Sequence, residues 1–402
     1  MRVLVISQYF PPDMGGGATR AYNVAKGLLL NNCEVKVIAA FPHYPDGNIP
    51  EVYRWKALRI EKVEGIDVIR TFMPPLASQG IAKRLILFIS FLISSLFALP
   101  LVNDFDIIWA ANPNILSMFP AMIYGRLKRC PIALNVDDLW TGSIFNRREN
   151  SLMVRMIAFL SRLVYSKANM ITPISPGYVG VIHENFNVSL EKIRVIRGGV
   201  DLSKFGENHT LSNNCKKNFR LLYVGAFSVA YNFNQVLLAA KILEEEGIDF
   251  VMQGRGELID YVKSRAKELK LKNLKIIDKI VCRDEVAKFL NTADALILPL
   301  RNFDRPYLGI STKLYEYQAV GKPILCCAEG QPAKYVMETE SGIVVKPGDY
   351  GALSKAVLYL RENRDVAEKL GASGRKYVEN NLSIEKIGLK MMTVFKKVCT
   401  PR

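Results

Sequence analysis

The sequence has few histidines and no cysteine spacing that would bind a metal. Only three histidines occur, and seven cysteines, an odd number, are scattered between Cys33 and Cys399. Neither residue type forms a zinc-ligand pattern, and an odd, scattered set of cysteines is not a disulfide framework. The composition therefore argues against a zinc domain or a disulfide-rich secreted domain, and we expect no metal site and a reducing, cytoplasmic environment.

A secretory signal and a nucleic-acid-binding motif are also missing. The chain opens directly with an apolar strand pattern at residues 2–6. Half of the residues are hydrophobic and 23% are charged, which excludes a disordered chain. The net charge of +16 is spread evenly over both halves of the sequence. We therefore expect a globular, cationic protein of two domains that attracts nucleotide phosphates and anionic membranes, with no nucleic acid partner.

Two stretches have the strand, glycine-rich loop and helix order of a nucleotide-binding α/β domain. In the first, residues 2–6 precede Gly15, Gly16 and Gly17, and helical periodicity runs over residues 18–30. In the second, the apolar residues 250–252 precede a Gly-Arg-Gly turn at 254–256. The first loop is not Gly-x-Gly-x-x-Gly, and no acidic residue closes the strand after it, so a dinucleotide cofactor is disfavoured. The pattern predicts two Rossmann-like domains.

The most informative stretch runs from Asp304 to Pro323. It follows a buried strand pattern and contains a helix that begins near Lys313 and ends at Gly321. A helix N-terminus offers free N–H groups to a phosphate, and Lys313 adds a full positive charge. Glu316, one turn further on, can bind the two hydroxyls of a ribose. The stretch therefore indicates a socket for a nucleoside diphosphate, although an exposed Lys313–Glu316 surface pair gives the same pattern.

Residues 316–323, Glu-Tyr-Gln-Ala-Val-Gly-Lys-Pro, resemble the donor-site motif of the retaining glycosyltransferases of family four, which have the two-Rossmann GT-B fold. The usual Glu-x7-Glu pattern of that family would place its first Glu at Leu308. A bacterial and archaeal branch that makes surface polysaccharide (O-antigen or capsule, fucosamine-transferase-like) lacks this Glu and reads Pro-Ser-Lys-Leu-x-Glu-Tyr here. The sequence resembles that branch over essentially its whole length.

The resemblance implies an α/β GT-B fold, with two Rossmann-like domains facing across a cleft and a C-terminal helix that crosses back to the N-terminal domain. The implied domains are an acceptor-binding domain, residues 1–203 with 384–402, and a donor-binding domain, residues 204–383. The donor residues that it implies come from both domains. They are Gly16, Gly17, Arg20, Gly225, Gly254, Arg255, Gly309, Ile310, Ser311, Thr312, Lys313 and Glu316.

An Arg and a Lys that hold the diphosphate in many members are missing after the strand that ends at Gly225. The phosphate charge would then rest on Lys313 and the helix N-terminus at 310–313. For the chemistry we expect Asp138 first and Asp137 second, at the carboxyl end of a buried strand, where an Asp can orient or deprotonate an acceptor hydroxyl. The alternative is an Asp that caps the next helix, with Trp140 packed beneath it. Acceptor contacts are expected from His43, Tyr44 and Trp140.

Two apolar segments suggest contact with a membrane. Residues 85–102 carry no charge and follow Lys83 and Arg84, and the second segment spans residues 151–168. The first has the length of a marginal membrane span, but it lies between strands of a soluble domain. Interfacial, buried and spanning helices all fit its composition. We expect peripheral, monotopic contact of residues 81–102 and 151–168 with the anionic inner face of the cell membrane.

Together these features predict a metal-independent retaining hexosyl- or N-acetylhexosaminyltransferase in cell-surface polysaccharide synthesis. It would need no cofactor besides its co-substrate, a UDP- or GDP-linked sugar, and its acceptor would be a lipid-linked saccharide. A non-hydrolysing nucleotide-sugar epimerase uses the same fold, but it would need His and carboxylate pairs that this chain has few of. A catalytically decayed scaffold that binds sugar nucleotides is the other alternative.

Overall fold

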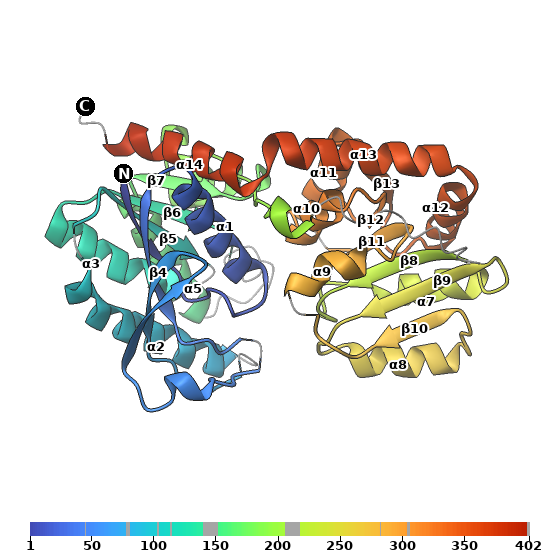
Figure 1. Cartoon of the computed structure of the whole chain (residues 1–402), viewed down its shortest axis with the longest axis horizontal. Helices are drawn as coiled ribbons and strands as arrows, with labels where there is room; N and C mark the ends of the chain where they lie inside the picture. The colour runs from blue at the N-terminus through green and yellow to red at the C-terminus, as the bar shows by residue number, and fades with distance from the viewer. Residues whose placement is uncertain are drawn as a thin grey trace. The chain divides into compact units, whose positions relative to one another are not determined.

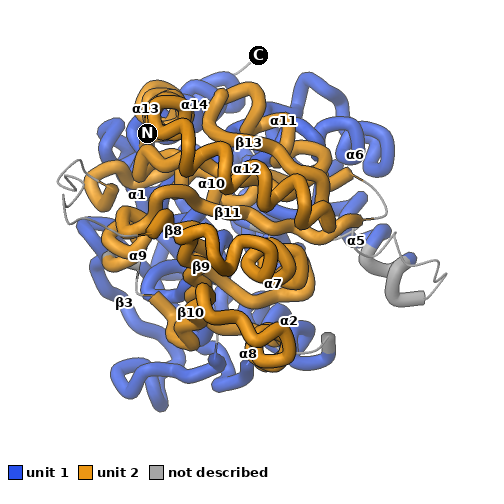
Figure 2. Tube along the Cα trace, turned by 90° about the vertical axis from the view of Figure 1, so that its right-hand side faces the viewer, with its two compact units in different colours: residues 1–199, 384–402 blue, residues 200–383 orange. Residues whose placement is uncertain are grey.

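The computed structural model describes residues 1–44, 46–77, 81–102, 104–112, 115–139, 152–205, 218–281, 283–303 and 306–399. The chain forms two compact units, coloured separately in Figure 2. Unit 1 comprises residues 1–199 and 384–402, and unit 2 comprises residues 200–383. The chain thus leaves unit 1 once and returns to it for the last helix, whereas the sequence placed the domain boundary at 203/204.

Unit 1 is built on a seven-stranded sheet with the order β3-β4-β2-β1-β5-β6-β7. All neighbouring strands are parallel except β3, which pairs antiparallel with β4 at one edge. Strands β1, β2, β4 and β5 are largely buried because their Val, Ile and Ala residues face helices on both sides. The strands are β1 (Arg2–Ile6), β2 (Glu34–Ala40), β3 (Leu58–Val63), β4 (Ile66–Thr71), β5 (Ile107–Asn112), β6 (Ile132–Val136) and β7 (Met170–Pro173).

The helices of unit 1 connect these strands (Figure 1). They are α1 (Gly16–Leu30), α2 (Ile81–Ala98), α3 (Met118–Lys128), α5 (Leu152–Lys167), α6 (Gly177–Phe186) and α14 (Ile384–Cys399). Short 3₁₀ turns are η1 (Glu51–Tyr53), η2 (Leu99–Leu101), η3 (Ile115–Ser117) and η4 (Leu190–Lys192). As expected from the sequence, the last helix belongs to the first unit.

Unit 2 contains a six-stranded, fully parallel sheet with the order β10-β9-β8-β11-β12-β13. In order of appearance this is 3-2-1-4-5-6, the strand order of a dinucleotide-binding Rossmann fold. The strands are β8 (Phe219–Val224), β9 (Ile248–Gln253), β10 (Leu274–Ile277), β11 (Ala295–Pro299), β12 (Ile324–Cys327) and β13 (Gly342–Val345). Both predicted Rossmann-like sheets are therefore present.

In unit 2 one 3₁₀ turn precedes β8, and the helices lie between the strands and after β13, where α12 and α13 follow each other (Figure 1). They are η5 (Leu202–Phe205), α7 (Phe233–Ile242), α8 (Ile259–Glu268), α9 (Arg283–Leu290), α10 (Thr312–Ala319), α11 (Gln331–Glu338), α12 (Tyr350–Glu362) and α13 (Arg364–Asn381). The predicted end of the motif helix is confirmed, because α10 stops at Ala319 and Gly321 adopts a φ of 65°.

Each sheet reverses its strand order at one place, and ligands of open α/β sheets bind beyond the carboxyl ends of the strands at such a point. In unit 1 the reversal lies between β1 and β5, and in unit 2 between β8 and β11. The loops that follow β1 and β8 carry Gly16 and Gly225. Topology alone thus places both predicted glycine loops at ligand-binding edges.

Two glycines allow α14 to pack closely on α1. A Cβ added to Gly27 would lie 2.2 Å from the Ile384 carbonyl oxygen, and one added to Gly388 would lie 2.1 Å from the Gly27 carbonyl oxygen. The Asn31 amide reinforces the contact by donating to the Glu385 carbonyl oxygen at 2.9 Å. The return of the chain to unit 1 therefore depends on having no side chain at these two positions.

We predict that Gly27→Ala and Gly388→Ala each destabilise unit 1, because the added methyl forces two helix backbones apart. Overpacking of this kind costs about 1–3 kcal/mol, and in a unit of this size each kcal/mol lowers Tm by about 2–4 °C. Differential scanning calorimetry measures the shift. Gly180→Ala in α6 is the matched control, since a Cβ there would meet only the Glu184 carboxylate at 3.9 Å. An equal Tm for all three variants would refute the close packing.

Candidate functional site

The centre of the candidate site in unit 2 is the ammonium group of Lys313, which lies over Gly225. A Cβ added to Gly225 would lie 2.0 Å from Lys313 Nζ, so the ammonium occupies the space that a side chain would fill. Lys313 Nζ also lies 5.7 Å from the ring centre of Tyr223 and 5.8 Å from that of Tyr231. These cation–π contacts hold the charge at the end of β8, where the sheet order reverses.

Lys313 is the second residue of α10, so its charge adds to the positive end of the helix dipole. Ser311 is the N-cap residue, but its side chain makes no capping hydrogen bond. Ser311, Thr312 and Lys313 are partly exposed, whereas Gly309 and Ile310 are buried. Glu316 is partly exposed and lies one turn beyond Lys313. The N–H groups of a helix start and an ammonium therefore converge beside Gly225, which is an arrangement suited to a phosphate.

The glycine turn after β9 packs directly against the loop after β8. A Cβ on Gly254 would lie 1.8 Å from the Gly225 carbonyl oxygen, and the Phe227 N–H donates to the Arg255 carbonyl oxygen at 2.9 Å. The Arg255 side chain turns to Asp278, with Nε 3.1 Å from Oδ1. Lys263 also contacts Asp278, and the two cations lower the pKa of that carboxyl. The structure thus brings Gly225, Gly254 and Lys313 together and places the Arg255 guanidinium on Asp278.

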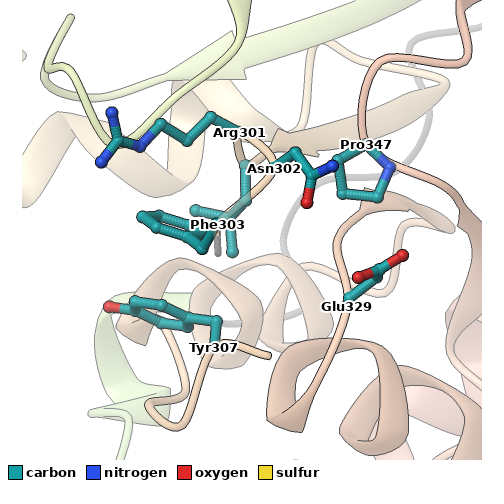
Figure 3. A pocket seen from close by; sticks show the side chains of 7 residues that line it. Arg301, Asn302, Phe303, Tyr307, Glu329 and Pro347 are labelled. Carbon is teal, nitrogen blue, oxygen red and sulfur yellow. The ribbon is translucent and has the colours of Figure 1, made fainter. Parts of the chain in front are cut away.

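A small open pocket lies at the same carboxyl edge of the unit 2 sheet (Figure 3). The rings of Phe303 and Tyr307 stack with centroids 5.3 Å apart, and the Arg301 guanidinium lies 4.9 Å from the Phe303 ring centre. Glu329 faces the pocket from the end of β12. The pocket is lined by Leu300, Arg301, Asn302, Phe303, Tyr307, Glu329 and Pro347. An aromatic face beside a carboxylate is chemically suited to a sugar ring.

Arg20 of unit 1 is buried and bonded to the protein, with only 3% of its surface exposed. Its Nη2 donates to Asn135 Oδ1 at 3.1 Å and to the Ile196 carbonyl oxygen at 2.8 Å. Its Nη1 donates to the Arg197 carbonyl oxygen, also at 2.8 Å. The observed role of Arg20 is therefore to tie α1 to β6 and to the segment after β7. A direct contact of Arg20 with the donor stays a prediction.

Asp137 lies at the carboxyl end of β6 and its side chain is 13% exposed. Its Oδ1 accepts a hydrogen bond from Asn135 Nδ2 at 2.7 Å and lies 3.9 Å from Arg20 Nε. Its Oδ2 is buried and has no hydrogen-bond partner within the described part of the chain. Burial raises the pKa of Asp137 to about 7, although Arg20 and Asn135 both act to lower it. Such a carboxyl can accept a proton near neutral pH.

Asp138 follows directly and is exposed as a residue, but burial of its carboxyl group also raises its pKa. The sequence favoured Asp138 for the chemistry and Asp137 second, and this order stays a prediction. Of the two, Asp137 is the one that contacts Asn135 and Arg20. Trp140, the predicted acceptor contact beyond them, lies outside the described residues.

The predicted acceptor residues His43 and Tyr44 follow β2 and belong to a cluster around Asp13. Asp13 Oδ1 accepts the N–H groups of both His43 and Tyr44 at 2.8 Å. The His43 ring is 3% exposed and stacks on Tyr9, with Nδ1 2.8 Å from the Phe41 carbonyl oxygen. Tyr44 is 38% exposed. Tyr44 can therefore reach a ligand, whereas His43 supports the loop from beneath.

Gly16 and Gly17 begin α1, and Gly15 before them has a φ of 104°. Both are at least partly exposed, so their N–H groups lie at an open helix start. The Tyr44 ring lies close to Gly15, where a Cβ would meet Tyr44 Cε1 at 3.3 Å. The structure thus brings Tyr44 and the glycine loop together at the carboxyl edge of the unit 1 sheet.

Sequence reasoning missed three elements of these sites. It did not single out Asp13, the two tyrosines under Lys313, or the stacked Phe303 and Tyr307. The spacing of aromatic residues at the end of β8 and after it, at 223, 227, 231 and 233, was the available signal for the tyrosines. The sequence contains no comparable signal for Asp13, because its hydrogen-bond partners His43 and Tyr44 are about thirty residues away. Among the described residues, no group of three His, Cys, Asp or Glu side chains could hold a metal ion.

Two family profiles match the chain, one for each half. The profile described as Glycosyltransferase Family 4 matches residues 14–204, and that described as Glycosyl transferases group 1 matches residues 207–377. An uncharacterised glycosyltransferase of Methanocaldococcus jannaschii is 22% identical over 98% of both chains. The N-acetylgalactosamine-N,N'-diacetylbacillosaminyl-diphospho-undecaprenol 4-alpha-N-acetylgalactosaminyltransferase of Campylobacter jejuni is 27% identical over 42% of this chain and 44% of its own.

Solved structures share the fold over nearly the whole chain. Sucrose-phosphate synthase of Thermosynechococcus elongatus has a TM-score of 0.78 at 17% identity, covering 99% of this chain and 98% of its own. The Anabaena protein HepE, solved in complex with UDP, has a TM-score of 0.71 at 14% identity, covering 99% and 100%. With both profiles and the two Rossmann-like units in agreement, the chain belongs to the glycosyltransferases of the family four and group 1 type, which have the GT-B fold.

Proposed function

We propose that this glycosyltransferase moves a sugar, with retention of configuration, from a UDP- or GDP-linked donor to a lipid-linked saccharide in cell-surface polysaccharide synthesis. The observation that carries the proposal is the Lys313 ammonium, held over Gly225 at the start of α10 and at the reversal point of the sheet. A diphosphate placed there would meet one full positive charge and the N–H groups of a helix start.

The same groups account for the chemistry that we propose. The bond between the anomeric carbon and the donor phosphate breaks, and the leaving diphosphate gains negative charge that Lys313 and the α10 N-terminus stabilise. The acceptor hydroxyl oxygen forms the new bond to the anomeric carbon on the face that the diphosphate leaves. Its proton passes to the departing phosphate oxygen. This route requires neither a protein nucleophile nor a metal ion, and we propose a metal-independent reaction without a further cofactor.

The nucleoside part of the donor is assigned to unit 2. Glu316 lies one turn beyond Lys313 on α10, where its carboxylate can accept both ribose hydroxyls. Support for a uridine nucleotide comes from the Anabaena structure, which contains UDP in the same fold. The stacked Phe303 and Tyr307, with Glu329 opposite, offer a place for the sugar ring.

The lipid-linked acceptor is supported by the outer face of α2. This helix buries Leu87, Phe88, Phe91 and Ala98 against unit 1. Its opposite side, here named the α2 apolar face, consists of residues that are each 42–71% exposed. They are Leu85, Ile86, Ile89, Ile93 and Phe97 of α2, together with Leu101 of the following turn η2. A purely buried core helix, one of the alternatives from the sequence, does not fit this exposure.

Residues 82–101 are long and apolar enough to cross a membrane, by length and composition alone, but only a third of them are buried. Because one side of α2 belongs to the core of unit 1, we propose that the other side lies in the membrane interface. The exposed Lys83 and Arg84 at its start, and the exposed Phe159 and Arg155 of α5, fit the same anionic surface on the cytoplasmic side. The Campylobacter relative, whose name includes a diphospho-undecaprenol acceptor, agrees with a lipid-linked substrate.

Nucleotide binding tests the donor site. We expect UDP or GDP, but not NAD, to raise Tm, since a ligand at a hundredfold its Kd stabilises the fold by about 2.7 kcal/mol. Lys313→Ala and Glu316→Ala should each weaken binding about tenfold or more, because each removes a charged partner of the ligand. Gly225→Ala should do the same, since its methyl displaces the Lys313 ammonium. Thermal melts over a nucleotide titration measure all three.

The matched control is Lys334→Ala, which removes an exposed lysine of α11. It should leave the nucleotide-induced shift unchanged. Equal shifts in wild type and Lys313→Ala, with equal Tm in the absence of nucleotide, would contradict the assignment of the donor site.

The raised pKa of Asp137 predicts a pH-dependent stability. Between about pH 4 and pH 7 the folded protein holds a proton on Asp137 that the unfolded chain releases, so this group lowers stability by about 1.4 kcal/mol per pH unit as pH rises. Asp137→Asn should remove this loss, so that the variant gains in Tm relative to wild type from pH 5 to pH 8. Asp67→Asn, at a half-exposed position in the same unit, should show no such trend. A constant Tm difference for Asp137→Asn across this range would show that Asp137 is already ionised at pH 5.

Transfer to lipid tests the acceptor class. Purified enzyme, radiolabelled UDP- or GDP-sugar and a membrane lipid extract should give label that partitions into butanol. Ile89→Ser combined with Ile93→Ser should lower both vesicle binding and this transfer severalfold, because two apolar side chains leave the α2 apolar face. The nucleotide-induced Tm shift should stay unchanged in this variant. Label recovered only in water-soluble saccharides would overturn the lipid-linked acceptor.

A further inference from the structure

We propose that Trp55 is a second membrane anchor, which inserts into the lipid headgroup region beside the carboxyl edge of the unit 1 sheet. The inference rests on the membrane contact proposed above and adds a site far from the α2 apolar face in sequence. The turn that carries it, residues 52–56, is here named the Trp55 turn. It connects η1 to β3, the edge strand of the sheet.

Trp55 is fully exposed, at 103% of the reference surface for tryptophan. Its φ of 62° lies in the left-handed region, which is unfavourable for a bulky aromatic residue. The turn around it is nevertheless held in place. The Arg54 and Lys56 N–H groups donate to the Glu51 and Tyr53 carbonyl oxygens at 3.0 and 3.3 Å. The fold therefore presents the indole to its surroundings at a conformational cost, which calls for a function outside the chain.

The turn is anchored from below by Tyr53, which is 7% exposed. Its hydroxyl donates to the Glu61 carboxylate at 2.9 Å, and Glu61 also pairs with the buried Arg70 at 2.8 Å. The Arg59 guanidinium donates to the Val52 carbonyl oxygen at 3.0 Å. These hydrogen bonds hold the Trp55 turn in one conformation, so that the indole can insert into a membrane surface without a change in the turn.

The charges around Trp55 indicate the partner. Lys56 is exposed, and Arg54, with 60% of its side chain exposed, lies 3.6 Å from the carboxylate of Glu51. Glu51 offsets one of these cations, so one positive charge remains beside the indole. An exposed tryptophan flanked by lysine and arginine is the pattern of residues that settle at the membrane–water interface. Anionic headgroups would attract the cations while the indole enters the interface.

Exposed apolar residues connect the Trp55 turn with α2. Val52 is 51% and Phe72 is 47% exposed, and the Phe72 N–H donates to the Ala57 carbonyl oxygen at 3.0 Å. Phe72 follows β4, and α2 begins at Ile81 with Lys83 and Arg84 in its first turn. The chain that leads from β4 to α2 therefore starts beside the Trp55 turn.

The position of the anchor has a consequence for the acceptor. Leu58, at the start of β3, pairs with Thr71 at the carboxyl end of β4, and the Phe41 N–H donates to the Thr71 carbonyl oxygen at 2.8 Å. The Trp55 turn thus lies at the same sheet edge as the loop of Tyr44. A bilayer that holds Trp55 would deliver the diphosphate head of a lipid-linked saccharide at this edge, beside the residues proposed to bind it.

The experiment uses the full chain with Trp55 as its only tryptophan, prepared by Trp109→Phe and Trp140→Phe. Vesicles containing phosphatidylglycerol should shift its emission to the blue, and lipids brominated near the headgroup should quench it. Pure phosphatidylcholine vesicles should have a smaller effect. In the otherwise unchanged protein, Trp55→Ser should weaken vesicle binding about tenfold, and Trp55→Phe should retain most of it. Vesicle flotation measures this binding in proteins that keep Trp109. This matters because Trp109 is fully buried in the core, and its replacement can affect folding.

The outcomes separate this inference from the proposed function. Two results together would overturn the Trp55 anchor and leave the α2 contact intact. Vesicles would leave the emission of the single-tryptophan protein unchanged. The Trp55→Ser variant would still float with vesicles, whereas the variant with both Ile89→Ser and Ile93→Ser would not. Failure of the wild-type protein to bind any vesicle would overturn both membrane contacts. An emission change caused only by a soluble oligosaccharide, or only by raised protein concentration, would assign Trp55 to a saccharide or to a second copy of the chain and would also overturn the anchor.

Discussion

The proposed donor site depends on one close approach, that of the Lys313 ammonium to the backbone of Gly225. A side chain at position 225 would take the space of Nζ, and one at position 254 would meet the Gly225 carbonyl oxygen. The two glycine turns are therefore stacked on each other beneath the lysine, and Tyr223 and Tyr231 offer their ring faces to it. The ring faces attract the ammonium without neutralising its charge, so the charge stays available for an anionic ligand.

In the proposed donor site, this arrangement would take over the role of the Arg and Lys pair that the resemblance to the family leads one to expect after the first strand of the donor domain. The remaining charge stands on the first turn of α10, where the helix dipole has the same sign. Positive charge is thus concentrated at one helix start. In unit 1 the helix that follows the glycine loop, α1, also carries a cation, Arg20. Its guanidinium donates hydrogen bonds to Asn135 and to the carbonyl oxygens of residues 196 and 197, so Arg20 has a structural role.

Unit 1 combines a polar edge with an apolar flank. At the edge, the loops after β1, β2 and β6 bring Asp13, Tyr44 and Asp137 to the carboxyl ends of the strands. On the flank, α2 buries one side and exposes five apolar residues on the other, and Leu101 of the following turn η2 adds a sixth. An acceptor that is itself half lipid and half saccharide matches these two surfaces, which is why we favour a substrate carried by the membrane over a soluble one.

Sequence patterns alone predict the fold, the two glycine loops and a lysine at the start of α10. These depend on local signals, since strand patterns, glycines and the start and end of α10 can be read within twenty residues. The role of Arg20, the burial of His43 and the different surroundings of Asp137 and Asp138 were decided by the tertiary structure alone. Each depends on partners between thirty and one hundred and eighty residues away, and burial, which sets the pKa of Asp137 near 7, exists only once β6, α1 and the chain after β7 have packed together.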